Sequence, residues 1–188
     1  MSHTHLISTK SELRALYGHP GKLPAAAKAD KLDELCKQFI NLSSFICISS
    51  CDSAGRQDVS PRGDFPGFVR VINDRTLAIP DRPGNNKLET LSNLLENPQV
   101  GLLFMIPGHD ETLRLFGRAS ISCAPEYLAA TAAKGKLPKS VILVEIDTVY
   151  PHCGKSTRRG NLWDASTYLQ KGEAPSLAAI ALKMAGKK

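Results

Sequence analysis

The chain has 188 residues, a net charge of +6 and a hydrophobic fraction of 42%, which favours one folded domain with a substantial core and argues against global disorder. The positive charge suits an anionic ligand, while an aromatic fraction of only 6% argues against a nucleic-acid partner. No apolar run approaches the roughly 18 residues of a membrane span, so no membrane partner is expected.

The first part of the chain is predicted to be helical. Residues 9–12 have the spacing of a capping box, and the following short helix ends at Gly18-His19-Pro20. A linker is expected over 20–29, after which Asp30 is placed to cap a second helix. The apolar residues of that second helix recur at three- and four-residue steps, as expected for one buried stripe: Leu32, Leu35, Cys36, Phe39 and Leu42.

The pattern then changes to short strands separated by turn signals. Strands are predicted at 45–48, 57–60, 68–72, 76–79, 100–106, 112–122 and 141–149, with helices at 86–97, 125–134 and 175–186. Consecutive hairpins dominate, and the strands do not alternate with crossover helices. The predicted fold class is therefore mainly β with flanking helices, built as an antiparallel barrel.

Three segments are expected along the chain. Residues 1–29 form an N-terminal helical extension, 30–165 the barrel domain, and 166–188 a C-terminal helix packed on the same domain.

Two loops at strand ends carry groups suited to an anion. The first, Asp58–Asp64, places a hydroxyl, a guanidinium and a glycine in succession. The second, Ile79–Lys87, is expected to run from a strand directly into a helix, where free backbone N–H groups and the helix dipole favour negative charge. Arg82 and Lys87 add cations, and Asn85 or Asn86 is placed to cap the helix. The alternative is that Pro-Gly-Asn-Asn is an ordinary turn and Lys87 a solvated side chain.

These loops, together with Gly101-Leu102-Leu103-Phe104 and the stretch from Thr112 to Ala119, resemble the pyridoxamine 5′-phosphate oxidase-like FMN-binding proteins. The resemblance covers roughly 33–163 and is nearest to a bacterial subgroup of probable FMN-dependent enzymes. It implies a split β-barrel and a homodimer with FMN at the subunit interface.

The resemblance also implies roles for individual residues. The first loop, residues 60–64, would line the ribityl phosphate and the flavin edge. The second loop, residues 80–87, would run beside the ring system and the phosphate. The start of the strand at 112 would reach a flavin from the partner subunit, and the segment from Lys155 to Trp163 would approach it from the C-terminal side. The implied cofactor-binding residues are Ser60, Arg62, Gly63, Asp64, Ile79, Pro80, Asp81, Arg82, Asn85, Asn86, Lys87, Thr112, Arg114, Lys155 and Trp163. Two of them depart from the pattern of the relatives: Asn86 stands where the oxidases proper tend to have Arg, and Thr112 where many relatives have Gln.

Two further motifs resemble anion-binding sites but give weaker evidence for one. Gly154-Lys155-Ser156-Thr157 resembles the end of a phosphate-binding P-loop, but Val149 stands where that loop requires glycine. The basic cluster of Lys155, Arg158 and Arg159 is interpreted as a solvated patch, with a second anion site as the alternative.

The cysteines indicate the compartment. Their odd number, and the lack of a secretory signal before them, favour free thiols in the cytoplasm. A zinc site formed with His152 stays an alternative, although the spacing fits no common template. The five cysteines are Cys36, Cys47, Cys51, Cys123 and Cys153.

The predicted function is that of an FMN-dependent oxidoreductase, with a small-molecule substrate and NADH or NADPH as the expected electron donor. In such an enzyme the cofactor carries the redox chemistry, so the lack of a visible catalytic dyad is expected. True pyridoxamine phosphate oxidase activity is not expected, because Trp163-Asp164-Ala165-Ser166 leads into an Ala-rich helix in place of a basic closing segment. The alternatives are a non-catalytic protein that stores flavin or haem, and RNA binding through the basic tail.

Overall fold

The computed structural model describes residues 5–186, apart from the side chains of residues 24 and 25. The first four residues of the predicted extension and the last two of the predicted C-terminal segment lie outside this range. The helices are α1 (Lys10–Tyr17), α2 (Lys22–Ala26), α3 (Glu34–Leu42), α4 (Glu89–Glu96), α5 (Pro125–Ala130), α6 (Lys155–Arg159), the 3-10 helix η1 (Ala165–Thr167) and α7 (Leu177–Met184). The strands are β1 (Phe45–Cys51), β2 (Gln57–Gly63), β3 (Arg70–Asn73), β4 (Thr76–Pro80), β5 (Gln99–Met105), β6 (Thr112–Ser122) and β7 (Val141–His152).

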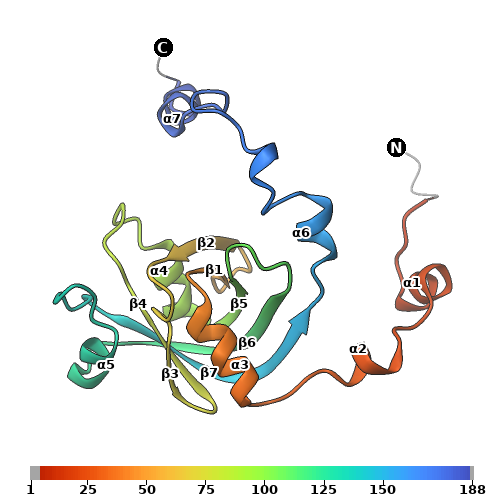
Figure 1. Cartoon of the computed structure of the whole chain (residues 1–188), viewed down its shortest axis with the longest axis horizontal. Helices are drawn as coiled ribbons and strands as arrows, with labels where there is room; N and C mark the ends of the chain where they lie inside the picture. Colours follow the sequence, from red (N-terminus) through yellow and green to blue (C-terminus); the bar gives the residue numbers. More distant parts are fainter. Residues whose placement is uncertain (1–4, 187–188) are drawn as a thin grey trace.

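The strands form one sheet in the order β2-β1-β5-β6-β7-β4-β3, and every pair is antiparallel. The sheet curls until the end of β2 reaches the segment that follows β4 (Figure 1). Two ion pairs join these ends, from Arg62 to Asp81 and from Arg82 to Asp64. The fold is therefore a split β-barrel, as predicted.

The interior of the barrel is apolar because side chains alternate between the two faces of each strand. In β1, Ile46 and Ile48 are fully buried while their neighbours are half exposed. Phe104 of the adjacent strand β5, Leu115 of β6 and Leu94 of α4 belong to the same buried cluster. This core holds the ends of β2 and β4 in fixed positions.

The register of β6 with β7 shifts between Phe116 and Gly117, where Asp147 of β7 has no partner on β6. A Cβ at Gly117 would overlap the carbonyl oxygen of Glu145 on β7. Only glycine permits this close approach of two backbones.

The helices differ from the prediction at several places. The helix expected over 125–134 ends at Ala130, and α6 was not predicted. The cap of α3 is Asp33, whose side chain accepts a hydrogen bond from Cys36 N, so the expected cap Asp30 was wrong. The linker expected over 20–29 contains the short helix α2. The helix expected from Asn86 begins only at Glu89, after Leu88 in the left-handed conformation.

The outward side chains of β2, β1, β5, β6 and β7 form an outer face that mixes apolar with polar and charged groups. They stay half-buried or exposed in the single chain, and Phe116 is 43% exposed. The rings of Phe116 and Tyr150 stack there, with centroids 6.0 Å apart. One continuous register row crosses the outer face and consists of Pro61, Cys47, Leu103, Arg114 and Tyr150.

Both terminal segments extend away from the barrel (Figure 1). On the N-terminal side the described extension is joined to β7 through a bridge between Ala29 and Val149. On the C-terminal side, α7 has no buried residue. The packing of this helix on its own barrel, which the sequence led us to expect, is not present in the single chain.

Candidate functional site

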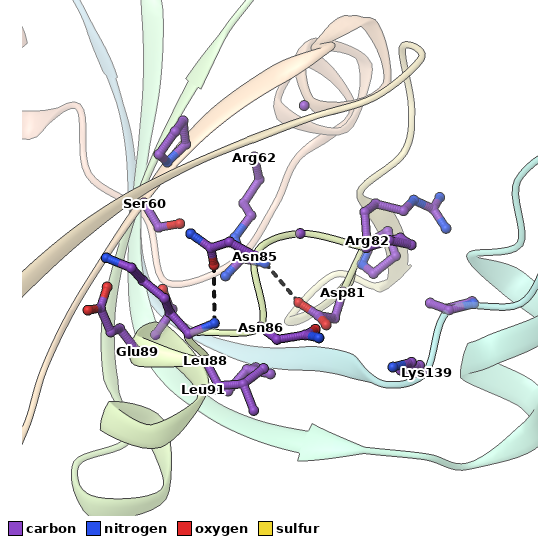
Figure 2. A pocket seen from close by; sticks show the side chains of 18 of the residues that line it. Ser60, Arg62, Asp81, Arg82, Asn85, Asn86, Leu88, Glu89, Leu91 and Lys139 are labelled. Carbon is purple, nitrogen blue, oxygen red and sulfur yellow. Dashed lines mark hydrogen bonds and ion pairs between the residues drawn. The ribbon is translucent and has the colours of Figure 1, made fainter. Parts of the chain in front are cut away.

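The two loops singled out in the sequence face one another across a pocket of about 870 Å³. One wall is the end of β2, and another is the loop from the end of β4 to the start of α4 (Figure 2). The predicted site residues that line it are Ser60, Arg62, Gly63, Pro80, Asp81, Arg82, Asn85, Asn86 and Lys87. Their joint position in one pocket is the principal feature of the candidate site.

Arg62 projects from β2 into this pocket. Its Nη1 donates a hydrogen bond to Oδ1 of Asp81 at 2.9 Å, and both side chains are about one-fifth exposed. Its Nε is buried and has no hydrogen-bond partner among the residues that the structure describes. A buried donor without a partner is costly, so an acceptor placed here by a ligand would be favoured.

Arg82 is held more completely than Arg62. Its Nε donates to Oδ2 of Asp64 at 2.7 Å and its Nη2 to the carbonyl oxygen of Thr131 at 2.9 Å. Asp64 therefore contacts the site through Arg82, although it does not line the pocket.

The loop before α4 takes an irregular path. Asn86 and Leu88 both have positive φ, at 57° and 59°. Oδ1 of Asn85 accepts a hydrogen bond from Lys87 N at 3.1 Å (Figure 2). The prediction that Asn85 or Asn86 caps the helix was therefore wrong, because the cap position is Leu88 and has no side-chain hydrogen bond.

The third wall of the pocket consists of residues 137–139, which the sequence reasoning missed. Lys139 brings a cation opposite the loop before α4 (Figure 2). Lys87 and Lys139 are exposed, and neither belongs to an ion pair within the described part of the chain. No local motif marks residues 137–139, because the approach of this segment depends on how the chain returns from β6 to β7.

The remaining predicted residues do not line the pocket. Ile79 is fully buried in the core. Thr112 and Arg114 lie at the start of β6, and Lys155 and Trp163 lie in the segment after β7. Trp163 Nε1 donates to the carbonyl oxygen of His109 at 2.9 Å.

Thr112 and Arg114 lie close to His152, which the sequence suggested only as a possible zinc ligand. Thr112 pairs with His152 across the sheet, and its Oγ1 is buried with no partner among the described residues. Arg114 Nη2 lies 3.2 Å from His152 Nε2. Since a guanidinium only donates, Nε2 must be unprotonated to accept. Burial, and then the charge of Arg114, lower the pKa of His152.

Two kinds of site can be assessed from the described residues 5–186. They contain no group of three or more His, Cys, Asp or Glu side chains arranged to hold a metal ion. Within the same range, no helix has the length and apolar character needed to cross a membrane.

The fold and the pocket define the chain as a split β-barrel protein with a partly basic pocket where β2 meets the loop after β4. The chain belongs to the pyridoxamine 5′-phosphate oxidase family, whose family model matches residues 32–153.

Solved structures share the fold at low sequence identity. HupZ of Group A Streptococcus is 18% identical with a TM-score of 0.52, covering 63% of this chain and 91% of that one. A putative pyridoxamine 5′-phosphate oxidase of Lactobacillus delbrueckii is 22% identical with a TM-score of 0.49, covering 65% of this chain and 95% of that one. A haem storage protein of Vibrio cholerae, HutZ, is 15% identical with a TM-score of 0.47, covering 65% and 94%. No curated protein matches the chain.

Proposed function

We propose that the pocket binds FMN and that the protein is an FMN-dependent oxidoreductase. The observation that carries this proposal is the meeting of the Ser60–Gly63 and Pro80–Lys87 loops around one pocket of about 870 Å³. That volume lies within the roughly 300–1,000 Å³ typical of cofactor sites.

The residues present fit a phosphorylated cofactor. Arg62 offers its buried, unpartnered Nε, and Lys87 offers an ammonium group at the rim of the pocket. The carboxamides of Asn85 and Asn86 add donors beside Lys87. We infer that Lys87 and Arg62 bind the phosphate, and that Pro80 and Asp81 run beside the ring system.

Bound FMN supplies the electron-transfer chemistry, and the protein supplies binding, orientation and electrostatics. The cations that line the pocket stabilise negative charge on the reduced ring. A small-molecule substrate and NADH or NADPH are the proposed reaction partners. The five cysteines are free, and the reducing cytosol is the proposed compartment.

We further propose a homodimer in which each site is shared. The register row on the outer face begins at Pro61, which lines the pocket, and continues to Arg114 and Tyr150. A two-fold axis through the outer face would bring the Arg114 end of one copy to the Pro61 end of the other. This arrangement accounts for why Thr112, Arg114, Lys155 and Trp163 lie away from the pocket of their own chain.

The residues of this chain that line the pocket offer no usual axial ligand for haem iron. None of them is His, Cys, Met or Tyr, which are the usual axial ligands of haem iron. A non-catalytic flavin store is separated from an enzyme by turnover. If the flavin-loaded protein is not reduced by NADH or NADPH and oxidises no substrate, the oxidoreductase proposal fails.

An absorption spectrum of the purified protein tests the cofactor. We expect flavin bands, and release of FMN on denaturation. A protein that stays colourless after incubation with excess FMN would contradict the proposal.

Replacing Lys87 tests the phosphate site. A charge-assisted hydrogen bond is worth about 1.5–3 kcal/mol, so Lys87→Ala should weaken FMN binding by roughly tenfold to a hundredfold. Fluorescence titration of the apoprotein measures this change. Lys171→Ala, at an exposed position in the segment between η1 and α7, is the matched control and should leave the affinity unchanged. Unchanged affinity in Lys87→Ala would locate the phosphate elsewhere.

A further inference from the structure

Arg82 connects three segments that are distant in the sequence. It follows β4 and is one-quarter exposed. Its Nε bonds Asp64 at the end of β2, and its Nη2 bonds the carbonyl oxygen of Thr131 at the end of α5. Two of its nitrogen atoms are thus engaged by the protein itself.

The contact with Thr131 closes the C-terminus of α5. The last carbonyl groups of a helix lack partners within it, and a cation there also favours the helix dipole. Arg70 Nε donates to the carbonyl oxygen of Ala130 at 2.9 Å, beside the bond from Arg82 to Thr131. Two arginines therefore hold the point at which the chain leaves α5.

The chain that leaves this point becomes the third wall of the pocket. A tight turn follows, in which Ala133 and Lys136 exchange backbone hydrogen bonds and Lys134 and Gly135 have positive φ, at 50° and 73°. Such a two-residue turn reverses the direction of the chain over the shortest possible loop. Residues 137–139 then line the pocket, and Asp81 N bonds the carbonyl oxygen of Ser140 at 2.9 Å.

Arg62 and Arg82 therefore differ in what they leave free. The Nε of Arg62 is buried and has no partner among the described residues, whereas the Nε of Arg82 donates a hydrogen bond to Asp64. We propose that Arg82 is a positioning residue and not a ligand of the cofactor phosphate. By bonding both Asp64 and Thr131, a connection called the clasp below, it holds residues 131–139 in place as a wall of the pocket. This inference rests on the proposed function, because it takes FMN as the ligand of the pocket.

A comparison of FMN with riboflavin, which lacks the phosphate, tests this role. If Arg82 shapes the wall, Arg82→Gln lowers the affinity for both flavins by a similar factor, about tenfold for each. Lys87→Ala is the reference for a phosphate ligand and should lower the affinity for FMN far more than that for riboflavin. A loss in Arg82→Gln that is confined to FMN would overturn the proposal.

Two further measurements do not depend on flavin. Backbone amide hydrogen exchange in residues 131–139 should become faster in Arg82→Gln than in the wild type. The double variant Arg82→Gln, Asp64→Asn should lower Tm by less than the sum of the two single variants, because both single variants break the same ion pair. Unchanged exchange together with additive Tm changes would overturn the clasp even if FMN binds.

Asp64→Asn also covers the case in which Arg82→Gln does not fold, because it removes one contact of Arg82 and leaves the bond to Thr131. If the wild-type protein binds neither flavin, the proposed function fails, while exchange and Tm still decide the clasp.

Discussion

At the scale of single residues, the arrangement around His152 is defined by one hydrogen bond. Arg114 donates to His152 Nε2 at 3.2 Å, so the histidine is held in its neutral form. Burial and the adjacent guanidinium both lower the pKa of His152. A proton added to His152 would break this bond and place two cations side by side.

This arrangement predicts a pH dependence of stability. Because the pKa of His152 is lower in the folded than in the unfolded chain, the unfolded chain binds more protons between the two values. The stabilisation is therefore present above the unfolded pKa of about 6.5 and is lost as the pH falls through the folded value. Urea unfolding at pH 8 and pH 5 should show a smaller loss of stability in His152→Gln than in the wild type. Equal losses in both proteins would contradict this assignment.

At the scale of elements, helix starts were the least predictable feature. Asn85 and Asn86 have the chemistry of helix caps, yet Asn86 takes a positive φ of 57° and the helix begins at Glu89. Asparagine tolerates the left-handed region better than most residues. The loop therefore follows the shape of the pocket wall, and local cap preference did not decide where α4 begins.

The cap of α3 provides a test of such a boundary. Asp33 accepts a hydrogen bond from Cys36 N at 2.7 Å, so Asp33→Ala should cost about 1 kcal/mol of unfolding free energy. For a chain of this size the corresponding decrease in Tm is roughly 2–4 °C. Differential scanning calorimetry measures it.

Asp30→Ala is the control for this prediction. Asp30 is the cap that the sequence favoured, but its side chain forms only an exposed ion pair with Arg75, and such pairs contribute little. A loss in Asp30→Ala as large as that in Asp33→Ala would show that the boundary is assigned wrongly.

At the scale of the whole molecule, the outer face keeps exposed apolar side chains that the single chain leaves uncovered. Phe116 is 43% exposed although it stacks on Tyr150. The proposed dimer would bury this pair and join the two sites.

We expect Phe116→Glu to convert the dimer to a monomer, because a carboxylate buried in the interface beside Tyr150 would lose its hydration. Sedimentation velocity measures the change. Leu35→Glu, on a side chain that is 75% exposed on α3, is the control and should leave the dimer intact. A Phe116→Glu protein that sediments as a dimer would exclude this face as the interface.

The sequence by itself determined the class of fold and much of the pocket. Period-two alternation dictates which side chains face the core, so the antiparallel barrel and the placement of the two loops at strand ends could be predicted. Local patterns reach only a few residues along the chain. They therefore located Arg62, Arg82 and both carboxylates, but not which arginine pairs with which carboxylate.

The tertiary structure alone decided which groups meet. Arg82 contacts Thr131, 49 residues away in the sequence. Lys139 lines the pocket because of a preceding turn that the sequence analysis did not predict. Curling of the sheet brings these segments together, and the register of the strands, which depends on the whole core, determines how far the sheet curls. The same register places Thr112 and Arg114 away from the pocket of their own chain; the resemblance had implied that the Thr112 position reaches the cofactor of the partner subunit.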